Sequence, residues 1–167
     1  MTEIKIESKI DVKEYIRLVF ILTYRRRIIR ILILLGFILL LWGILSLCNI
    51  WYSYGILTYA QLFLAVFILG FLPFVFYHRA IRNYNSNERL KEIITYVFSE
   101  KQIIIRGESF HVEMDWEKTF KIEEIKNWFL IFQNINSANI IPKRCFNDES
   151  LINFRNLIHS KNLIIRN

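Results

Sequence analysis

Residues 31–77 read ILILLGFILLLWGILSLCNIWYSYGILTYAQLFLAVFILGFLPFVFY, a run of 47 positions without a charged side chain. A soluble chain of 167 residues could not hide such a run, because much of its surface would be built from it. Polar residues within 49–55 divide the run into spans of about 31–48 and 57–77. Each span can cross roughly 30 Å of hydrocarbon at about 1.5 Å per residue. The sequence therefore predicts a two-helix transmembrane hairpin over residues 31–77.

Basic side chains stand on both flanks of the predicted hairpin, whereas the loop 49–55 between the spans carries no charge. The flanking arginines are Arg25, Arg26, Arg27 and Arg30 before the first span and Arg79 and Arg82 after the second. Because cytoplasmic loops are enriched in Lys and Arg, both termini are expected in the cytoplasm. The loop aromatics Trp51, Tyr52 and Tyr54 are then expected at the outer interface, where such rings collect.

Two features of the spans predict how they pack. Gly36 and Gly43 lie seven residues apart in the first span and therefore share a helix face. Glycines on such a face let a second helix approach closely. Pro73 lies near the end of the second span, where a proline predicts a kink close to the inner interface.

Residues 1–30 predict a cytoplasmic segment made of a short strand and an amphipathic helix. Apolar and polar residues alternate over 4–10, which is compatible with a strand. Asp11, with Glu14 three positions later, predicts a helix N-cap, and the helix over 12–30 could continue into the first span. Its apolar face could lie on the inner leaflet or pack against the C-terminal domain, and both alternatives stay open.

Residues 88–167 predict a small antiparallel-sheet domain that ends in a helix. Strands are expected over residues 93–98, 103–106, 110–114, 128–133 and 138–141. Residues 116–125 fit no single structure. Asn147 or Asp148 is expected to cap a helix whose apolar face covers the sheet. The predicted fold class is α+β, with the transmembrane hairpin followed by this domain.

Short segments of the C-terminal region occur in a set order. They are residues 96–100 (YVFSE), 103–105 (III), Trp116, 121–124 (KIEE), 128–132 (WFLIF), 140–144 (IIPKR), Phe146 and 154–155 (FR). In this order they resemble the YcxB-like family, small bacterial membrane proteins with two spans and a C-terminal domain similar to the pleckstrin-homology-like (PH-like) fold. The resemblance implies a PH-like domain, a bacterial inner-membrane location and no established catalytic site.

The motifs present narrow the classes of function. Neither span contains an acidic or basic side chain, which argues against transport by a single chain, although a pore of several copies stays open. The three histidines lack metal-ligand neighbours, and there is no phosphate-binding glycine loop or nucleophile elbow. We therefore expect no catalysis, cofactor or metal. A basic stripe with interleaved aromatics is missing, so nucleic acid is not an expected partner.

Basic residues are the candidate site residues, because anionic lipid head groups attract arginine and lysine beside a membrane. The candidates for lipid contact are Arg25, Arg26, Arg27, Arg30, Arg79, Arg82, Lys143 and Arg144. For Lys143 and Arg144 the alternative is that they flank a strand end or pair with nearby acids.

The expected protein is a non-enzymatic one of the bacterial inner membrane, presenting a cytoplasmic PH-like module to a protein or lipid partner. An alternative is an immunity protein that protects the cell against a secreted or membrane-active toxin. Small two-span proteins without catalytic machinery suit that role. A structural subunit of a larger membrane complex is a third possibility, and an oligomer is compatible with each of them.

Overall fold

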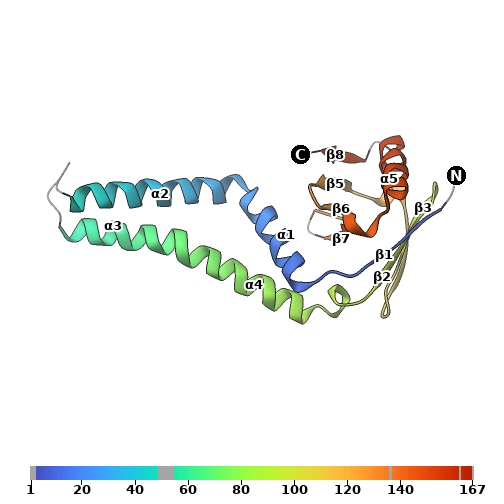
Figure 1. The fold of residues 1–167 in the computed structure, drawn as a ribbon, viewed down its shortest axis with the longest axis horizontal. Helices are drawn as coiled ribbons and strands as arrows, with labels where there is room; N and C mark the ends of the chain where they lie inside the picture. Colours follow the sequence, from blue (N-terminus) through green and yellow to red (C-terminus); the bar gives the residue numbers. More distant parts are fainter. Residues whose placement is uncertain (1–2, 49–54, 136, 162, 167) are drawn as a thin grey trace. The chain divides into compact units, whose positions relative to one another are not determined.

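The computed structural model describes residues 3–48, 55–135, 137–161 and 163–166, and the chain forms two compact units. A helical unit comprises Asp11–Asn87, and a β unit combines Met1–Ile10 with Glu88–Asn167. The predicted α+β class is confirmed, since helices that could span a membrane precede a small sheet domain and its helix (Figure 1). The predicted outer aromatics at 51, 52 and 54 lie outside the described residues.

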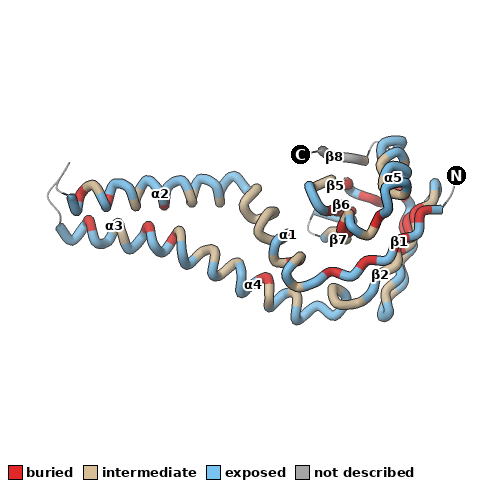
Figure 2. The backbone as a smooth tube through the Cα atoms, viewed as in Figure 1, coloured by how far each residue is buried: buried red, intermediate tan, exposed pale blue. Residues whose placement is uncertain are grey.

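The helical hairpin is formed by α2 and by a second, longer helix that changes its winding once. The elements are α2 (Arg27–Leu47), α3 (Ile56–Val66), the π-helical turn Phe67–Phe71 and α4 (Leu72–Ser86). Both helices are long and apolar enough to cross a membrane, which suggests a membrane protein. Most of their side chains are exposed, and the buried residues lie on the facing sides (Figure 2).

Close packing of the two helices occurs where the sequence predicted it. Gly36 and Gly43 are buried, and a Cβ added at Gly43 would lie 2.5 Å from Cδ2 of Leu62. The nearest side-chain atom to a Cβ at Gly36 would be 2.9 Å away. Between the same helices, the hydroxyls of Ser46 and Thr58 form a buried hydrogen bond of 3.0 Å. Small residues thus let α2 and α3 touch, and one polar pair is satisfied between them.

Near Pro73, where the sequence predicts a kink, the second helix contains the π-helical turn. Proline has no N–H to donate, and its ring crowds the carbonyl group four residues earlier. A π-helical turn widens the helix locally and changes the hydrogen-bond pattern just before Pro73. The helix then continues to Ser86, nine residues beyond the end of the predicted span.

Helix α1 (Val12–Tyr24) begins after Asp11, whose N–H donates to Oε2 of Glu14 at 3.4 Å, so the predicted cap is confirmed. The prediction that this helix continues into the first span is wrong. Arg26 has an extended backbone, with φ −67° and ψ 129°, and α2 begins anew at Arg27. The chain turns at this point, and α1 lies alongside α4 instead of extending α2 (Figure 1).

Packing of α1 on α4 answers the question that the sequence left open about its apolar face. The Tyr15 ring lies 5.8 Å from the ring of Tyr84, and Nδ2 of Asn83 donates to the Tyr15 hydroxyl at 2.5 Å. Tyr15 and Leu18 are buried. The helix therefore packs within its own unit, on the end of the second long helix.

The β unit contains two four-stranded sheets and one long helix. The first sheet has the order β1 (Ile4–Ser8), β2 (Ile94–Phe98), β3 (Gln102–Arg106) and β4 (His111–Asp115), all antiparallel. The second has the order β7 (Ala138–Pro142), β6 (Trp128–Phe132), β5 (Lys121–Ile125) and β8 (Ile164–Arg166). Helix α5 (Asp148–Ser160) follows a short 3₁₀ turn, Lys143–Cys145.

The N-terminal segment predicted over 1–30 is divided between the two units. Ile4, Ile6 and Ser8 of β1 are buried, and β1 pairs with β2 in the register Ile4 to Phe98. The ambiguous residues 116–125 form a 3₁₀ turn and then β5. Strand β8 was not predicted, and its pairing with β5 is parallel.

Aromatic side chains fill the core of the β unit. Phe154 of α5 is fully buried, and its ring centroid lies 4.5 Å from Phe98, 5.0 Å from Phe129 and 5.1 Å from Phe146. Asn147 caps α5, since its Oδ1 accepts the Ser150 N–H at 2.7 Å. The predicted terminal helix therefore closes the core, with side chains from both sheets packed against it.

Candidate functional site

Positive charge is concentrated in the helical unit. Residues 11–87 contain eight Lys or Arg side chains and only two acidic ones, whereas the β unit contains 14 basic and 13 acidic side chains. Attraction to an anionic surface is therefore a property of the helices, and the β unit is close to neutral.

The second long helix extends beyond the thickness of a bilayer. Its 31 residues, Ile56–Ser86, span about 46 Å at 1.5 Å per residue, against roughly 30 Å of hydrocarbon. The polar last part of α4 carries Arg79 and Arg82 and is the part on which α1 packs. Helix α1 and the last part of α4 can therefore lie in the head-group region at the end of the hairpin.

An open hollow of about 480 Å³ lies between α1 and α4. Its lining residues are Tyr15, Val19, Arg79, Ala80, Arg82, Asn83 and Ser86. Arg79 and Arg82 are exposed and three residues apart, so they share one face of α4. Within the described residues, neither arginine forms an ion pair with an acid. Two guanidinium groups beside hydroxyl and amide groups suit a phosphate-bearing ligand.

Tyr15 holds the two walls of this hollow together. Burial raises the pKa of its hydroxyl, and the hydrogen bond from Asn83 lowers it by less. The hydroxyl therefore stays protonated at neutral pH and accepts the Asn83 N–H. This bond joins α1 to α4 across the hollow.

The structure brings the other predicted arginines to the same end of the hairpin. Arg25, Arg26, Arg27 and Arg30 lie where α1 ends and α2 begins, and α2 runs antiparallel to the second long helix (Figure 1). Arg26, Arg27 and Arg30 are exposed, and no ion pair is formed by these three in the part of the chain that the structure describes. We call these four residues, together with Arg79 and Arg82, the juxtamembrane arginines.

Lys143 and Arg144 do not belong to this group, because they lie in the β unit and have partners there. Lys143 Nζ is 2.7 Å from Oε1 of Glu124. This is the pairing with a nearby acid that the sequence left open as the alternative to lipid contact. Arg144 Nη2 donates to the backbone carbonyl of Lys9 at 2.9 Å, which ties the turn after β7 to the end of β1.

Glu124 joins three elements through its carboxylate. Oε1 accepts hydrogen bonds from Lys143 of the 3₁₀ turn and from Nη2 of Arg155 in α5, the latter at 2.6 Å. Burial raises the pKa of the Glu124 carboxyl, but the bonds from Lys143 and Arg155 outweigh it, so the pKa lies below its ordinary value. Sequence reasoning missed this network, although all three residues lie in segments that carried the family resemblance.

Replacing Glu124 with Gln is expected to destabilise the β unit at neutral pH by about 2 kcal/mol, allowing for the partial exposure of Arg155. A lowered folded-state pKa contributes stability that is present above the ordinary value of 4.5 and is lost as pH falls through the folded-state value. Urea unfolding at pH 7 and pH 3 should therefore show a difference between wild type and variant that shrinks at pH 3. An equal difference at both pH values would contradict a role for the ionised carboxylate.

The matched control for this experiment is Glu88→Gln. Glu88 also pairs with a lysine, Lys91, at 2.8 Å, but its side chain is 78% exposed. A surface pair of this kind contributes little, so we expect a change within about 0.5 kcal/mol at either pH.

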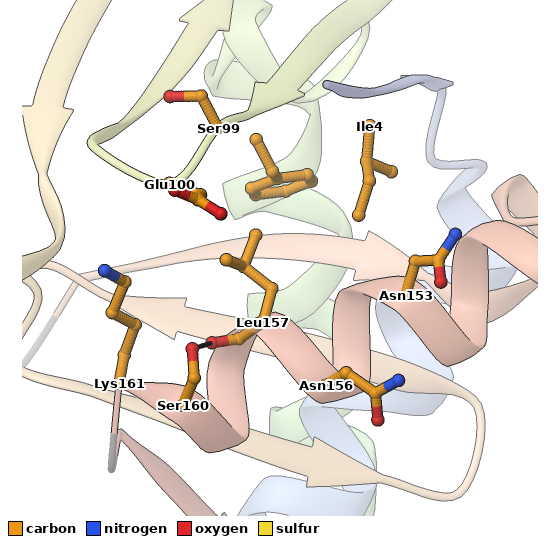
Figure 3. A pocket seen from close by; sticks show the side chains of 9 residues that line it. Ile4, Ser99, Glu100, Asn153, Asn156, Leu157, Ser160 and Lys161 are labelled. Atoms are coloured by element: carbon orange, nitrogen blue, oxygen red, sulfur yellow. Dashed lines mark hydrogen bonds between the residues drawn. The ribbon is translucent and has the colours of Figure 1, made fainter. Parts of the chain in front are cut away.

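A pocket of about 570 Å³ lies on the β unit between α5, β1 and the turn after β2 (Figure 3). Ile4, Phe98 and Leu157 form its apolar part. The polar lining consists of Ser99, Glu100, Asn153, Asn156, Ser160 and Lys161. Its size is within the usual range for small-ligand sites, and the sequence did not predict it. No group of three or more His, Cys, Asp or Glu side chains could hold a metal ion among the described residues.

Comparison with known proteins finds one similarity, which lies within the β unit. Residues 98–158 match the family model of the YcxB-like protein. This segment is similar to the YcxB-like proteins. The resemblance predicted from the sequence is thereby confirmed over these residues. No curated protein and no solved structure matches the chain. The YcxB-like segment includes the Glu124 network and most of the pocket lining, whereas the helical unit, β1 and β8 lie outside it.

Proposed function

We propose that this chain is a non-catalytic protein of the bacterial inner membrane that holds a cytoplasmic, PH-like binding module at the membrane surface, for a protein or lipid partner. The observation that carries the proposal is the group of juxtamembrane arginines at one end of an apolar hairpin. Five of them form no ion pair within the described residues, namely Arg26, Arg27, Arg30, Arg79 and Arg82. Such a group is attracted to anionic head groups and to the cytoplasmic side of a bacterial membrane.

Strand pairing supports the placing of both termini on one side. β1 precedes the helices in the chain and β2 follows them, yet the two strands pair over five residues in one sheet. A sheet cannot form across a bilayer, so the chain must cross the membrane an even number of times between β1 and β2. Two spans fulfil this condition, and the juxtamembrane arginines favour the cytoplasm as the shared side.

The chemistry of the hollow between α1 and α4 supports lipid contact there. Arg79 and Arg82 can each donate to phosphate oxygens, and the polar groups of Tyr15 and Ser86 line the same hollow. Each basic residue near an anionic surface contributes about 1 kcal/mol. Two arginines therefore favour an anionic over a zwitterionic head group by about 2 kcal/mol, which corresponds to roughly 30-fold in affinity.

Replacing both Arg79 and Arg82 with Gln is expected to reduce the preference for anionic lipid by roughly 30-fold. The measurement is a titration of the full chain in neutral detergent with dioctanoyl phosphatidylglycerol, compared with dioctanoyl phosphatidylcholine. A matched control removes two exposed charges from the β unit, Lys101→Gln and Arg106→Gln, and should leave the preference unchanged. If the control variant lost the preference and the α4 variant kept it, the lipid site would not be this hollow.

Immunity against a toxin stays a prediction, because no contact or cavity among the described residues bears on it. Coexpression of the chain with a toxin encoded beside its gene is the direct test, with cell survival as the measurement.

A further inference from the structure

A second hollow of the helical unit, of about 270 Å³, lies between α2 and the second long helix at the level of the π-helical turn. We call it the apolar hollow, because the side chains that line it are aliphatic or aromatic. Among them are Tyr24 at the end of α1, Ile33 and Phe37 on α2, and Ile68, Leu72 and Phe76 on the second long helix. A hollow with so few polar groups does not retain ordered water and suits a hydrocarbon chain.

One face of α4 lines both the apolar hollow and the hollow between α1 and α4. Leu72 and Phe76 line the first. Arg79, Asn83 and Ser86 line the second. These five positions follow one another at intervals of four, three, four and three residues, so they lie on the same side of the helix. Residues of α1 line both hollows as well. The two hollows therefore lie in line along one pair of helices.

The order of the two hollows along α4 matches the order of the parts of a phospholipid. The apolar hollow lies within the uncharged run, and Arg79 and Arg82 come after its last residue, Tyr77. From Phe76 to Arg79 the helix rises about 4.5 Å, at 1.5 Å per residue. The glycerol and ester groups that separate a phosphate from its acyl chains can lie across this short step. One lipid can therefore place its phosphate and a chain in the two hollows at once.

We propose that the two hollows form a single site for an anionic phospholipid, with the phosphate at Arg79 and Arg82 and one acyl chain in the apolar hollow. The inference rests on the proposed function, which supplies the membrane and the head-group contact, and it specifies where the chain of the bound lipid lies. A soluble phosphate compound would use the arginines alone. Lipids that merely surround the hairpin would show no preference for either hollow.

The test compares two Ile→Trp variants of the full chain in neutral detergent. Ile33→Trp places a bulky ring in the apolar hollow, whereas Ile38→Trp places the same ring at a position of α2 that is 50% exposed. Native mass spectrometry measures the affinity of each variant for dioctanoyl phosphatidylglycerol. We expect Ile33→Trp to lower this affinity about tenfold, through the lost packing of the chain, and Ile38→Trp to leave it unchanged.

The chain-free head group, glycerophosphoglycerol, separates a failure of this inference from a failure of the head-group contact. It should bind the wild type and Ile33→Trp equally, because both keep Arg79 and Arg82. If Ile33→Trp binds the lipid as the wild type does, or if Ile38→Trp weakens binding as strongly, the inference is wrong and the head-group contact stands. If the wild type does not prefer phosphatidylglycerol to phosphatidylcholine, the head-group contact fails, and the inference fails with it.

A second measurement needs no substitution and so does not depend on the folding of a variant. The probe is phosphatidylglycerol with a photoreactive diazirine in one acyl chain, and the labelled residues of the wild-type chain are identified by peptide mass spectrometry. Label should concentrate at residues 24–37 and 68–76 and should be removed by excess phosphatidylglycerol more readily than by phosphatidylcholine. Even labelling along both long helices, unaffected by either competitor, is the pattern of surrounding lipid and would overturn the proposal.

Discussion

Replacing Phe154 with Ala should destabilise the β unit by about 3–5 kcal/mol, the usual cost of removing a buried aromatic ring. Its ring has no exposure and lies within about 5 Å of the rings of Phe98, Phe129 and Phe146, so the cavity would open at the centre of the core. A domain of this size has a total stability of about 5–15 kcal/mol. Chemical denaturation of the full chain, followed by the fluorescence of the buried Trp116 and Trp128, measures the loss.

Ile152→Ala is the matched control in the same helix. Ile152 is 57% exposed, so its truncation removes little buried surface and should change the stability by less than about 0.5 kcal/mol. Equal effects of the two substitutions would mean that α5 does not close the core through Phe154.

Replacing Gly43 with Leu is expected to separate α2 from α3 and to destabilise the hairpin by about 2–3 kcal/mol. Even the first added carbon would lie 2.5 Å from Cδ2 of Leu62, so the new side chain cannot fit unless the helices move apart. The Ser46–Thr58 hydrogen bond spans the same helix pair and would be lost with the contact. Unfolding in mixed micelles with increasing dodecyl sulfate measures the change.

Gly70→Leu provides the control, because it adds the same apolar side chain and removes a helical glycine as well. A Cβ at Gly70 meets no atom within 4 Å, so the leucine would point into open space or lipid. The hairpin should keep its stability or gain slightly. A loss equal to that of the Gly43 variant would show that the effect arises from hydrophobicity rather than from the contact between helices.

These results bear on function through the pairing of β1 with β2. β1 and β2 are separated by the entire helical unit, yet they pair. Loosening the core of the β unit therefore also loosens the pairing between the two chain segments that flank the helical unit. The proposed lipid site lies on α1 and α4, so substitutions in the core of the β unit do not touch it directly.

The hairpin, its basic end and most strands could be predicted from the sequence because their signals are local. An uncharged run of 47 residues, arginines at its flanks, short apolar runs in β3 and β6 and alternation within β4 can each be recognised within a short window. The spacing of Gly36 and Gly43 was sufficient to predict the helix contact for the same reason. The end of α1 was mispredicted, since residues 25–27 contain no glycine or proline that would mark a helix end, while α1 packs on α4 and the chain turns there.

Only the tertiary structure shows that β1 joins the C-terminal sheet, that Glu124 binds Lys143 and Arg155, and that β8 pairs with β5. Each of these contacts joins residues far apart in the chain, such as Ile4 with Phe98 and Glu124 with Arg155. Alternation predicts that a strand will pair, and a buried carboxylate is expected to bind a cation. Neither pattern specifies which strand or which cation the partner will be. The choice among the possible partners is made by how the whole core packs, which no local stretch of residues specifies.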